Sequence, residues 1–201
     1  MSLRNKKLLK NGMVLYHGSN EVVQYPEIRK TMGYKDFGDG FYTTVEIKQA
    51  KTYAIRVDKR FRELNGNVSY ETSHPVVNIY KVSTIEDLNI KHFKDATVSW
   101  LRFVCRNRDI NIKDKNKHGK DIIIGKIADD DTKRVLDEYM YGDKSLYREI
   151  AKMKGLTVEQ EVISRLLTDR LEEQLLFATQ KALSRIIFIG KESLLNGKWV
   201  R

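Results

Sequence analysis

The stretch D-F-G-D-G-F-Y-T-T-V at residues 36–45 decides how the rest of the chain is interpreted. Gly38 and Gly40 stand directly before a run of aromatic and β-branched residues, which is typical of a turn that leads into a strand. A Rossmann site needs the opposite order, because its glycine-rich loop follows a strand and opens a helix. The stretch therefore argues against a Rossmann fold, and the sequence contains no Walker loop.

Apolar spacing on both sides of this stretch predicts a mixture of strands and helices. Strands are expected at 14–16, 41–45, 76–82, 122–125, 175–179 and 185–189. Helices are expected at 48–64, 98–104, 131–141 and 157–171, and the polar segments 106–120 and 142–155 are expected to be loops. The first helix is expected to be amphipathic, because apolar residues recur at three and four positions: Ala50, Tyr53, Ala54, Val57 and Phe61. The last is expected to start with Thr157 as its N-cap, in a capping-box pattern with Gln160. Because the strands are short and the helices lie unevenly between them, the pattern favours an α+β fold over a doubly wound parallel sheet.

Length and composition indicate one folded domain. A chain of 201 residues with 41% hydrophobic and 32% charged residues can bury a core and has the size of a single domain. We expect residues 1–12 to form an N-terminal extension, or a segment added for expression, and residues 13–201 to form the domain.

The net charge indicates which partners the protein can bind, and the single cysteine limits which disulfides and metal sites it can form. The formal net charge of +10 makes an anionic partner plausible, although a basic surface can also serve solubility alone. Cys105 is the only cysteine, which excludes an internal disulfide and a cysteine-based zinc site, and no metal site is predicted. We expect a cytoplasmic protein, because no run of apolar residues is long enough to span a membrane and no signal peptide is readable.

Three separated segments carry residues suited to chemistry. In the first, Tyr-His-Gly-Ser at 16–19, a histidine at the end of a short strand precedes a glycine that lets a ligand approach the backbone. In the second, Tyr42 can offer a flat aromatic face to a planar cation. In the third, polar residues at 172–174 head an apolar strand and can point into a cleft.

The order and spacing of these segments resemble the ADP-ribosyltransferases. The similarity is to the diphtheria-toxin and poly(ADP-ribose)-polymerase side of that superfamily, with its His–Tyr–Glu triad, and within it to a poorly characterised bacterial family with similar motifs. It covers about residues 13–189 and includes the segment 121–131 and the late strand with its Gln-x-x-Phe-x-Thr pattern.

The resemblance implies a split β-sandwich with a cleft for NAD, which would be the substrate. It implies that His17 hydrogen-bonds a ribose hydroxyl, that Ser19 supports the same ribose, and that the backbone of Gly18 contacts the nicotinamide amide. Tyr42 would stack on the nicotinamide ring. Residues of the segment around Tyr42 complete the predicted NAD-binding set: Gly40, Phe41 and Thr43.

One residue departs from the family triad. Gln174 stands where the larger family has a glutamate, and an amide oxygen accepts a hydroxyl without carrying negative charge. Either Glu172 or Glu173 can then be the functional carboxylate, or the aspartate run at 129–131 can supply it, with Asp129 as the residue we expect in the cleft. The same run also suits a helix N-cap. A third possibility is that the protein binds NAD without efficient turnover.

The resemblance implies a mono-ADP-ribosyltransferase that passes ADP-ribose to a macromolecular acceptor and releases nicotinamide. It further suggests a toxin-like or regulatory enzyme held in check by a small antitoxin-like protein. The basic charge mildly favours a nucleic-acid acceptor over a protein. Two alternatives stay open: a basic nucleic-acid-binding module whose cleft is vestigial, and an NAD glycohydrolase that uses water as the acceptor.

Overall fold

The chain is an α+β protein with two four-stranded sheets. The computed structural model describes residues 9–29, 35–66, 68–109, 111–112, 118–127, 130–166 and 171–201, with the side chains of residues 130 and 131 left out. The α+β class predicted from the sequence is therefore confirmed.

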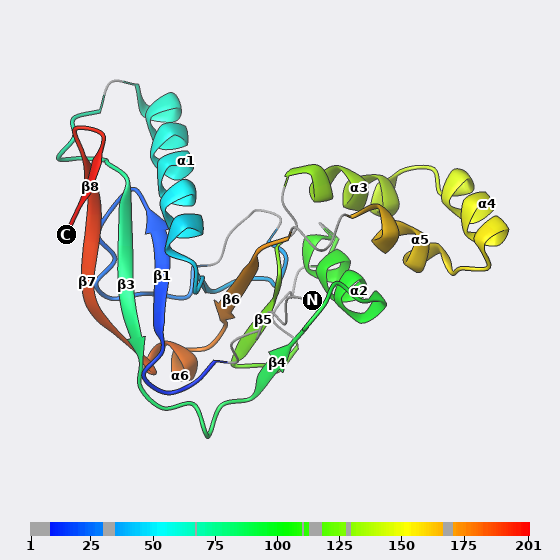
Figure 1. Ribbon diagram of the computed structural model, residues 1–201, viewed down its shortest axis with the longest axis horizontal. Coiled ribbons are helices and arrows are strands. Elements are labelled where there is room, and N and C mark those ends of the chain that lie inside the picture. The colour runs from blue at the N-terminus through cyan, green and yellow to red at the C-terminus, as the bar shows by residue number, and fades with distance from the viewer. Residues whose placement is uncertain are drawn as a thin grey trace, which may run out of the picture.

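The first sheet, sheet A, is wholly antiparallel and has the order β1-β3-β7-β8 (Figure 1). Its strands are β1 (Val14–Ser19), β3 (Val76–Val82), β7 (Ile186–Leu195) and β8 (Lys198–Val200). β3 is the central strand of the three longer ones and pairs with β1 on one side and β7 on the other. Its almost fully buried, β-branched sequence suits that central place.

The second sheet, sheet B, has the order β2-β6-β5-β4. Its strands are β2 (Phe41–Thr43), β6 (Glu173–Phe177), β5 (Ile122–Lys126) and β4 (Ile90–His92). Only β4 and β5 run parallel, and the other pairs are antiparallel. The sheet therefore joins strands whose residues lie more than 130 positions apart in sequence, as Phe41 and Phe177 do.

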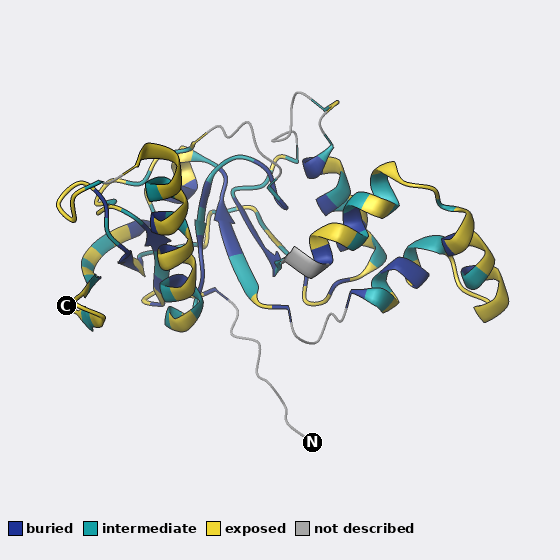
Figure 2. Ribbon diagram, turned by 90° about the horizontal axis from the view of Figure 1, so that it is seen from above, coloured by how far each residue is buried: buried dark blue, intermediate teal, exposed yellow. Residues whose placement is uncertain are grey.

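The longest helix, α1 (Ile47–Asn65), packs against β1 and β3 of sheet A and lies beside β1 in Figure 1. Ala50 packs on Val77 and Ile79 of β3, and these small and branched residues let the helix lie close to the strands. Opposite these contacts α1 is solvent-exposed (Figure 2). The helix is amphipathic as predicted, and it ends at Gly66 in a positive-φ conformation.

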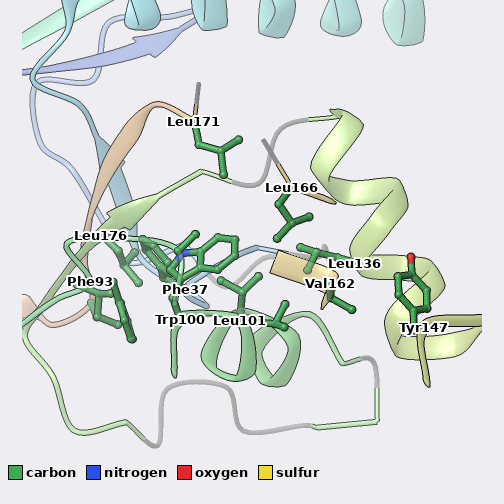
Figure 3. Close-up of a cluster of buried hydrophobic side chains, with 14 residues drawn as sticks. Phe37, Phe93, Trp100, Leu101, Leu136, Tyr147, Val162, Leu166, Leu171 and Leu176 are labelled. Carbon is green, nitrogen blue, oxygen red and sulfur yellow. The ribbon is translucent and has the colours of Figure 1, made fainter. Parts of the chain in front are cut away.

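Sheet B separates two apolar cores. On one side Phe41 and Phe177 pack against Leu15 and Tyr80 of sheet A, so the two sheets share this core. On the other side Leu176 and Phe37 pack against Trp100 and the remaining helices (Figure 3). That cluster involves α2 (Val98–Arg108), α3 (Asp130–Tyr141), α4 (Ser145–Lys154) and α5 (Val158–Arg165). A short helix, α6 (Gln180–Leu183), connects β6 to β7.

The predicted loop at 142–155 is wrong, because α4 occupies most of it. Only Tyr147 and Ala151 of this helix are buried, so its polar outer face had suggested a loop. The next helix, α5, begins at Val158 after its N-cap Thr157, which forms the predicted capping box with Gln160. It ends at Arg165, before the predicted end at residue 171. The part of the predicted helix at 167–170 lies outside the described residues.

The described part of the predicted N-terminal extension packs on the domain. Leu9 is buried in the core shared by the two sheets, and the Gly12 N–H donates to the Val82 carbonyl at 2.8 Å. Among the described residues, no helix has both the length and the apolar character that a membrane span requires.

Candidate functional site

A pocket of about 530 Å³ lies where the two sheets meet. Tyr16 of β1 and Thr44, just after β2, exchange backbone hydrogen bonds of 2.8 and 2.9 Å and join one edge of each sheet. The walls come from β1, from residues 35–44, from the near side of α1 and from the start of β6. Every described residue in the predicted NAD-binding and catalytic set borders this one pocket: His17, Gly18, Ser19, Gly40, Phe41, Tyr42, Thr43, Glu172 and Gln174.

His17 is held as a neutral imidazole with one defined tautomer. Its Nδ1 lies 2.7 Å from the carbonyl oxygen of Tyr42, and a carbonyl only accepts, so Nδ1 carries the proton and donates. Burial lowers the pKa of His17 from 6.5 to about 4, against the smaller raising effect of this hydrogen bond. At neutral pH, Nε2 is therefore an acceptor suited to a ligand hydroxyl.

Gly18 has two roles in the structure. The backbone N–H and C=O of Tyr16 both bond to Thr44, on the side of β1 that faces away from β3. In an antiparallel strand, the backbone groups of every second residue point to the same side. The N–H and C=O of Gly18 therefore point to the same open edge, at the pocket. A Cβ at this position would lie 2.2 Å from the Ala50 carbonyl oxygen, so the close approach of α1 also requires a glycine.

Ser19 lies at the end of β1, where it is buried and borders the pocket. Its Oγ accepts a 3.4 Å hydrogen bond from the Glu21 N–H, which forms part of the turn that leaves the strand. The side-chain oxygen of Asn78 on β3 accepts at 2.8 Å from Val23 N–H and fixes the same loop to sheet A. The serine is thus placed by a loop that is anchored on the central strand.

Tyr42 is oriented by the turn that precedes it. Its hydroxyl donates to the Gly38 carbonyl at 2.7 Å and accepts from the Phe37 N–H at 3.3 Å. Burial, with the nearby charge of Asp36, raises the pKa of Tyr42 well above its usual value, so the phenol stays protonated. The Lys35 ammonium lies over the ring, 5.8 Å from its centre, within the distance of a cation–π contact.

Gly40, Phe41 and Thr43 shape the wall around Tyr42. Gly40 has φ of +147°, and a Cβ there would lie 2.4 Å from the Phe177 carbonyl oxygen. The Phe41 side chain is buried in the core, where its ring lies 4.3 Å from that of His17 and supports the imidazole. Thr43 is buried, and its Oγ1 has no hydrogen-bond partner among the described residues.

The start of β6 places Gln174 beside Tyr42. Tyr42 pairs with Leu176, and Gln174 lies two residues along the same strand, so the two side chains project from one face of sheet B. Glu172 also borders the pocket. Glu173 projects from the opposite face, where its carboxylate lies 3.5 Å from His92 Nε2, so its carboxylate does not belong to the site.

Sequence reasoning missed an ion pair in the pocket wall. Asp36 and Arg108 are each only 6% exposed, and Arg108 Nε and Nη2 lie 2.7 and 2.5 Å from Asp36 Oδ1. Gln174 Nε2 donates to the other carboxylate oxygen at 3.2 Å. Arg108 had been assigned to a polar loop, and the two charged residues are 72 positions apart, so only the first residue of the D-F-G-D-G motif hinted at this pair.

Sequence reasoning also placed Tyr53 on the buried side of α1, and this is wrong. Tyr53 is 43% exposed and borders the pocket, whereas Ala50 and Ala54 of the same helix are buried. Three tyrosines therefore border the pocket: Tyr16, Tyr42 and Tyr53. The acidic Glu27 also borders the pocket, with three further basic residues that we call the basic rim: Arg29, Lys35 and Arg56. Their charges suit an anionic group such as a diphosphate.

Asp129, the aspartate that we expected in the cleft, lies outside the described residues. Within the described ranges no three His, Cys, Asp or Glu side chains form a group that could hold a metal ion. The described residues that border the pocket provide acceptors for ligand hydroxyl groups, aromatic side chains and the basic rim.

Comparison with protein-family models matches residues 13–188 to the family described as "Protein of unknown function (DUF3990)". Because the match covers most of the chain, the protein belongs to this family. A search of curated proteins and a search of solved structures each found no match.

Proposed function

We propose that this member of the DUF3990 family is an NAD-dependent ADP-ribosyltransferase with an ADP-ribosyltransferase-like split β-sandwich. The observation that carries the proposal is the convergence of His17, Tyr42 and Gln174 on one pocket from three distant segments. The pocket volume of about 530 Å³ lies within the range of small-molecule sites, about 300–1,000 Å³.

The aromatic walls suit the nicotinamide ring of NAD, which is flat and positively charged. Tyr42 and Tyr53 both border the pocket, and an aromatic face attracts a planar cation. The backbone N–H and C=O of Gly18 suit the carboxamide of the same ring, which both donates and accepts. The basic rim suits the diphosphate.

The reaction transfers ADP-ribose in two bond changes. The bond between ribose C1′ and the nicotinamide nitrogen breaks, and its electron pair stays on the nitrogen, so neutral nicotinamide leaves. The sugar becomes oxocarbenium-like, and the acceptor attacks C1′ and loses a proton. A site that leaves the sugar free of added positive charge favours this transition state. The lowered pKa of His17 serves that end, because a neutral imidazole binds a ribose hydroxyl without repelling the cation.

The acceptor is proposed to be a nucleic acid. The net charge of +10 attracts phosphate backbones, and Arg56 carries positive charge from the pocket rim onto the exposed face of α1. Regulation by a small antitoxin-like protein remains part of the proposal on the strength of the family resemblance alone.

Calorimetric titration with NAD⁺ and NADH tests the binding half of the proposal. NADH has the same nucleotides but an uncharged, puckered dihydronicotinamide, so we expect it to bind more weakly by about 2- to 30-fold. Tyr42→Ala and Tyr53→Ala should each remove most of this preference, while Tyr141→Ala, outside the pocket, should keep it. Equal binding of NAD⁺ and NADH, unchanged in both pocket variants, would contradict the assignment.

A further inference from the structure

The ion pair in the pocket wall joins two elements that are distant in sequence. Asp36 stands in the turn before β2, and Arg108 is the last residue of α2. Both side chains are 6% exposed, so the pair is held within the protein rather than on a solvated face. Arg108 contacts Oδ1 of the aspartate with two nitrogens, and Oδ2 is the oxygen that meets Gln174.

The contact with Asp36 determines how the Gln174 amide is turned. An ionised carboxylate has only acceptor atoms, whereas a primary amide has a donor end and an acceptor end. Nε2 therefore faces Oδ2, at 3.2 Å. Turning the amide by 180° would bring its oxygen against the carboxylate oxygen, so that two acceptors would face each other without a proton between them.

We propose that Asp36 and Arg108 are positioning residues that fix the Gln174 amide so that its Oε1 is the acceptor offered to the ligand in the pocket. With His17 held as the Nδ1–H tautomer, Nε2 of His17 and Oε1 of Gln174 are then two acceptors on the same pocket. Two acceptors that border one pocket suit a ligand with two hydroxyl donors, such as a ribose.

The hydrogen bond to Asp36 also makes the Gln174 amide oxygen a stronger acceptor, so that the neutral amide partly resembles a carboxylate. A hydrogen bond from Nε2 to a charged acceptor polarises the amide and places more electron density on Oε1. Asp36 thus acts on the ligand through Gln174, at the position where a glutamate was expected from the family triad. This consequence for NAD rests on the proposed function, whereas the orientation of the amide does not.

The orientation is tested first without any ligand, by NMR of the Gln174 side-chain amide. The resonance is identified by its loss in Gln174→Met. In the wild type we expect a downfield amide proton that exchanges slowly, as for a donor to a carboxylate. Asp36→Asn leaves the Arg108 charge buried without its carboxylate and can unfold, so the double variant Asp36→Asn/Arg108→Met removes both charges together. We expect an upfield, faster-exchanging Gln174 signal in the folded double variant.

The effect on the reaction is tested second, with NAD as the substrate. We expect the double variant to lower kcat by about tenfold or more while KM changes by less than about threefold, because the polarised oxygen matters most in the transition state. Arg108→Lys keeps a charge beside Asp36 and should retain most of the wild-type kcat.

An unchanged Gln174 signal in the folded double variant would overturn the positioning role. A wild-type protein that shows the ordered amide but neither binds nor consumes NAD would contradict the proposed function and leave the positioning role standing. A double variant in which KM rises with kcat unchanged would assign the pair to binding alone and overturn its effect on the transition state.

Discussion

His17 shows how one side chain can be prepared for a ligand by its surroundings. The imidazole of His17, on β1, packs against the ring of Phe41, and its Nδ1–H donates to the Tyr42 carbonyl. Because burial disfavours the charged imidazolium, the pKa falls to about 4 and the side chain is a neutral acceptor at physiological pH. The histidine can therefore bind a hydroxyl but does not serve as a cationic donor.

The pKa of His17 predicts a pH dependence of stability. The unfolded chain takes up a proton at this residue near pH 6.5, but the native protein does so only near pH 4. The free energy of unfolding should therefore fall as the pH drops from about 6.5 to about 4, with no further loss from this group below that range. Urea denaturation at several pH values should show this fall, and His17→Gln should flatten it.

The matched control for this prediction is His74→Gln, which removes a histidine outside the pocket. Its stability should follow the wild-type pH dependence. If the curves for His17→Gln and the wild type run parallel between pH 6.5 and 4, His17 is not held neutral by the fold.

The site residues that could be predicted from the sequence are those with a recognisable pattern of residues immediately beside them. His17 and Tyr42 stand in short segments with glycines beside them, and Gln174 heads an apolar strand. Asp36 and Arg108 could not be paired in this way, because a buried ion pair between distant elements leaves no periodic pattern in the sequence. Tyr53 was misplaced because an aromatic residue at helical spacing is as compatible with a pocket wall as with a core.

Among the elements, β1 and α1 are joined most closely at Gly18. A Cβ on this residue would lie 2.2 Å from the carbonyl oxygen of Ala50 and 2.8 Å from the nitrogen of Ala54, both of which are backbone atoms of α1. Neither atom can move without shifting the helix. The same helix carries Tyr53 and Gln49 into the pocket, so its distance from β1 sets the width of the site.

We therefore predict that Gly18→Ala destabilises the protein by about 1–3 kcal/mol or more, because the new methyl group forces α1 away from β1. Gly119→Ala is the control: its Cβ would meet no atom within 4 Å, and its φ of +62° alone should cost about 1–2 kcal/mol. Chemical denaturation compares the two. A Gly18→Ala protein as stable as the wild type would show that the helix does not rest on this glycine.

Elements that bury most of their residues were predicted from the sequence, and elements that bury few were missed. β3 was predicted at its observed bounds because nearly every residue in it is buried and β-branched or aromatic. α4 was missed because it buries only two residues and is otherwise polar. β4 and β8 are three residues long and gain their hydrogen bonds from neighbouring strands, so their local sequence gives little signal.

At the scale of the whole molecule, the pocket exists because the edges of two sheets meet. The order β2-β6-β5-β4 brings residues near 40 together with residues near 175, and this pairing is set by tertiary packing rather than by local propensity. The sequence alone could therefore predict the α+β class and the separate site segments, but the strand order and the shape of the pocket required the structure.

The net charge predicts how the protein binds a nucleic-acid acceptor. If phosphates contact the basic surface, the affinity for a short single-stranded oligonucleotide should fall steeply as salt is raised. Arg56→Gln/Arg60→Gln, on the exposed side of α1, should lower the slope of log affinity against log salt by about 1–2. Fluorescence anisotropy at several salt concentrations measures this slope.

The control for the acceptor is Lys198→Gln, which removes a positive charge from the hairpin at the far edge of sheet A. It should leave the salt slope close to that of the wild type. Affinity that does not depend on salt, or no binding of any oligonucleotide, would count against a nucleic-acid acceptor and in favour of a protein acceptor or water.

The most direct test of the central claim is the release of nicotinamide from NAD, followed by chromatography, for the wild type, His17→Ala and Tyr42→Ala. The account predicts release by the wild type and a loss of at least about 100-fold in both variants, with their circular dichroism spectra unchanged. With NAD labelled in its adenylate half, label found on the acceptor supports transfer, and label found only in free ADP-ribose supports hydrolysis. Folded variants that release nicotinamide as fast as the wild type, or a wild type that releases none, would contradict the account.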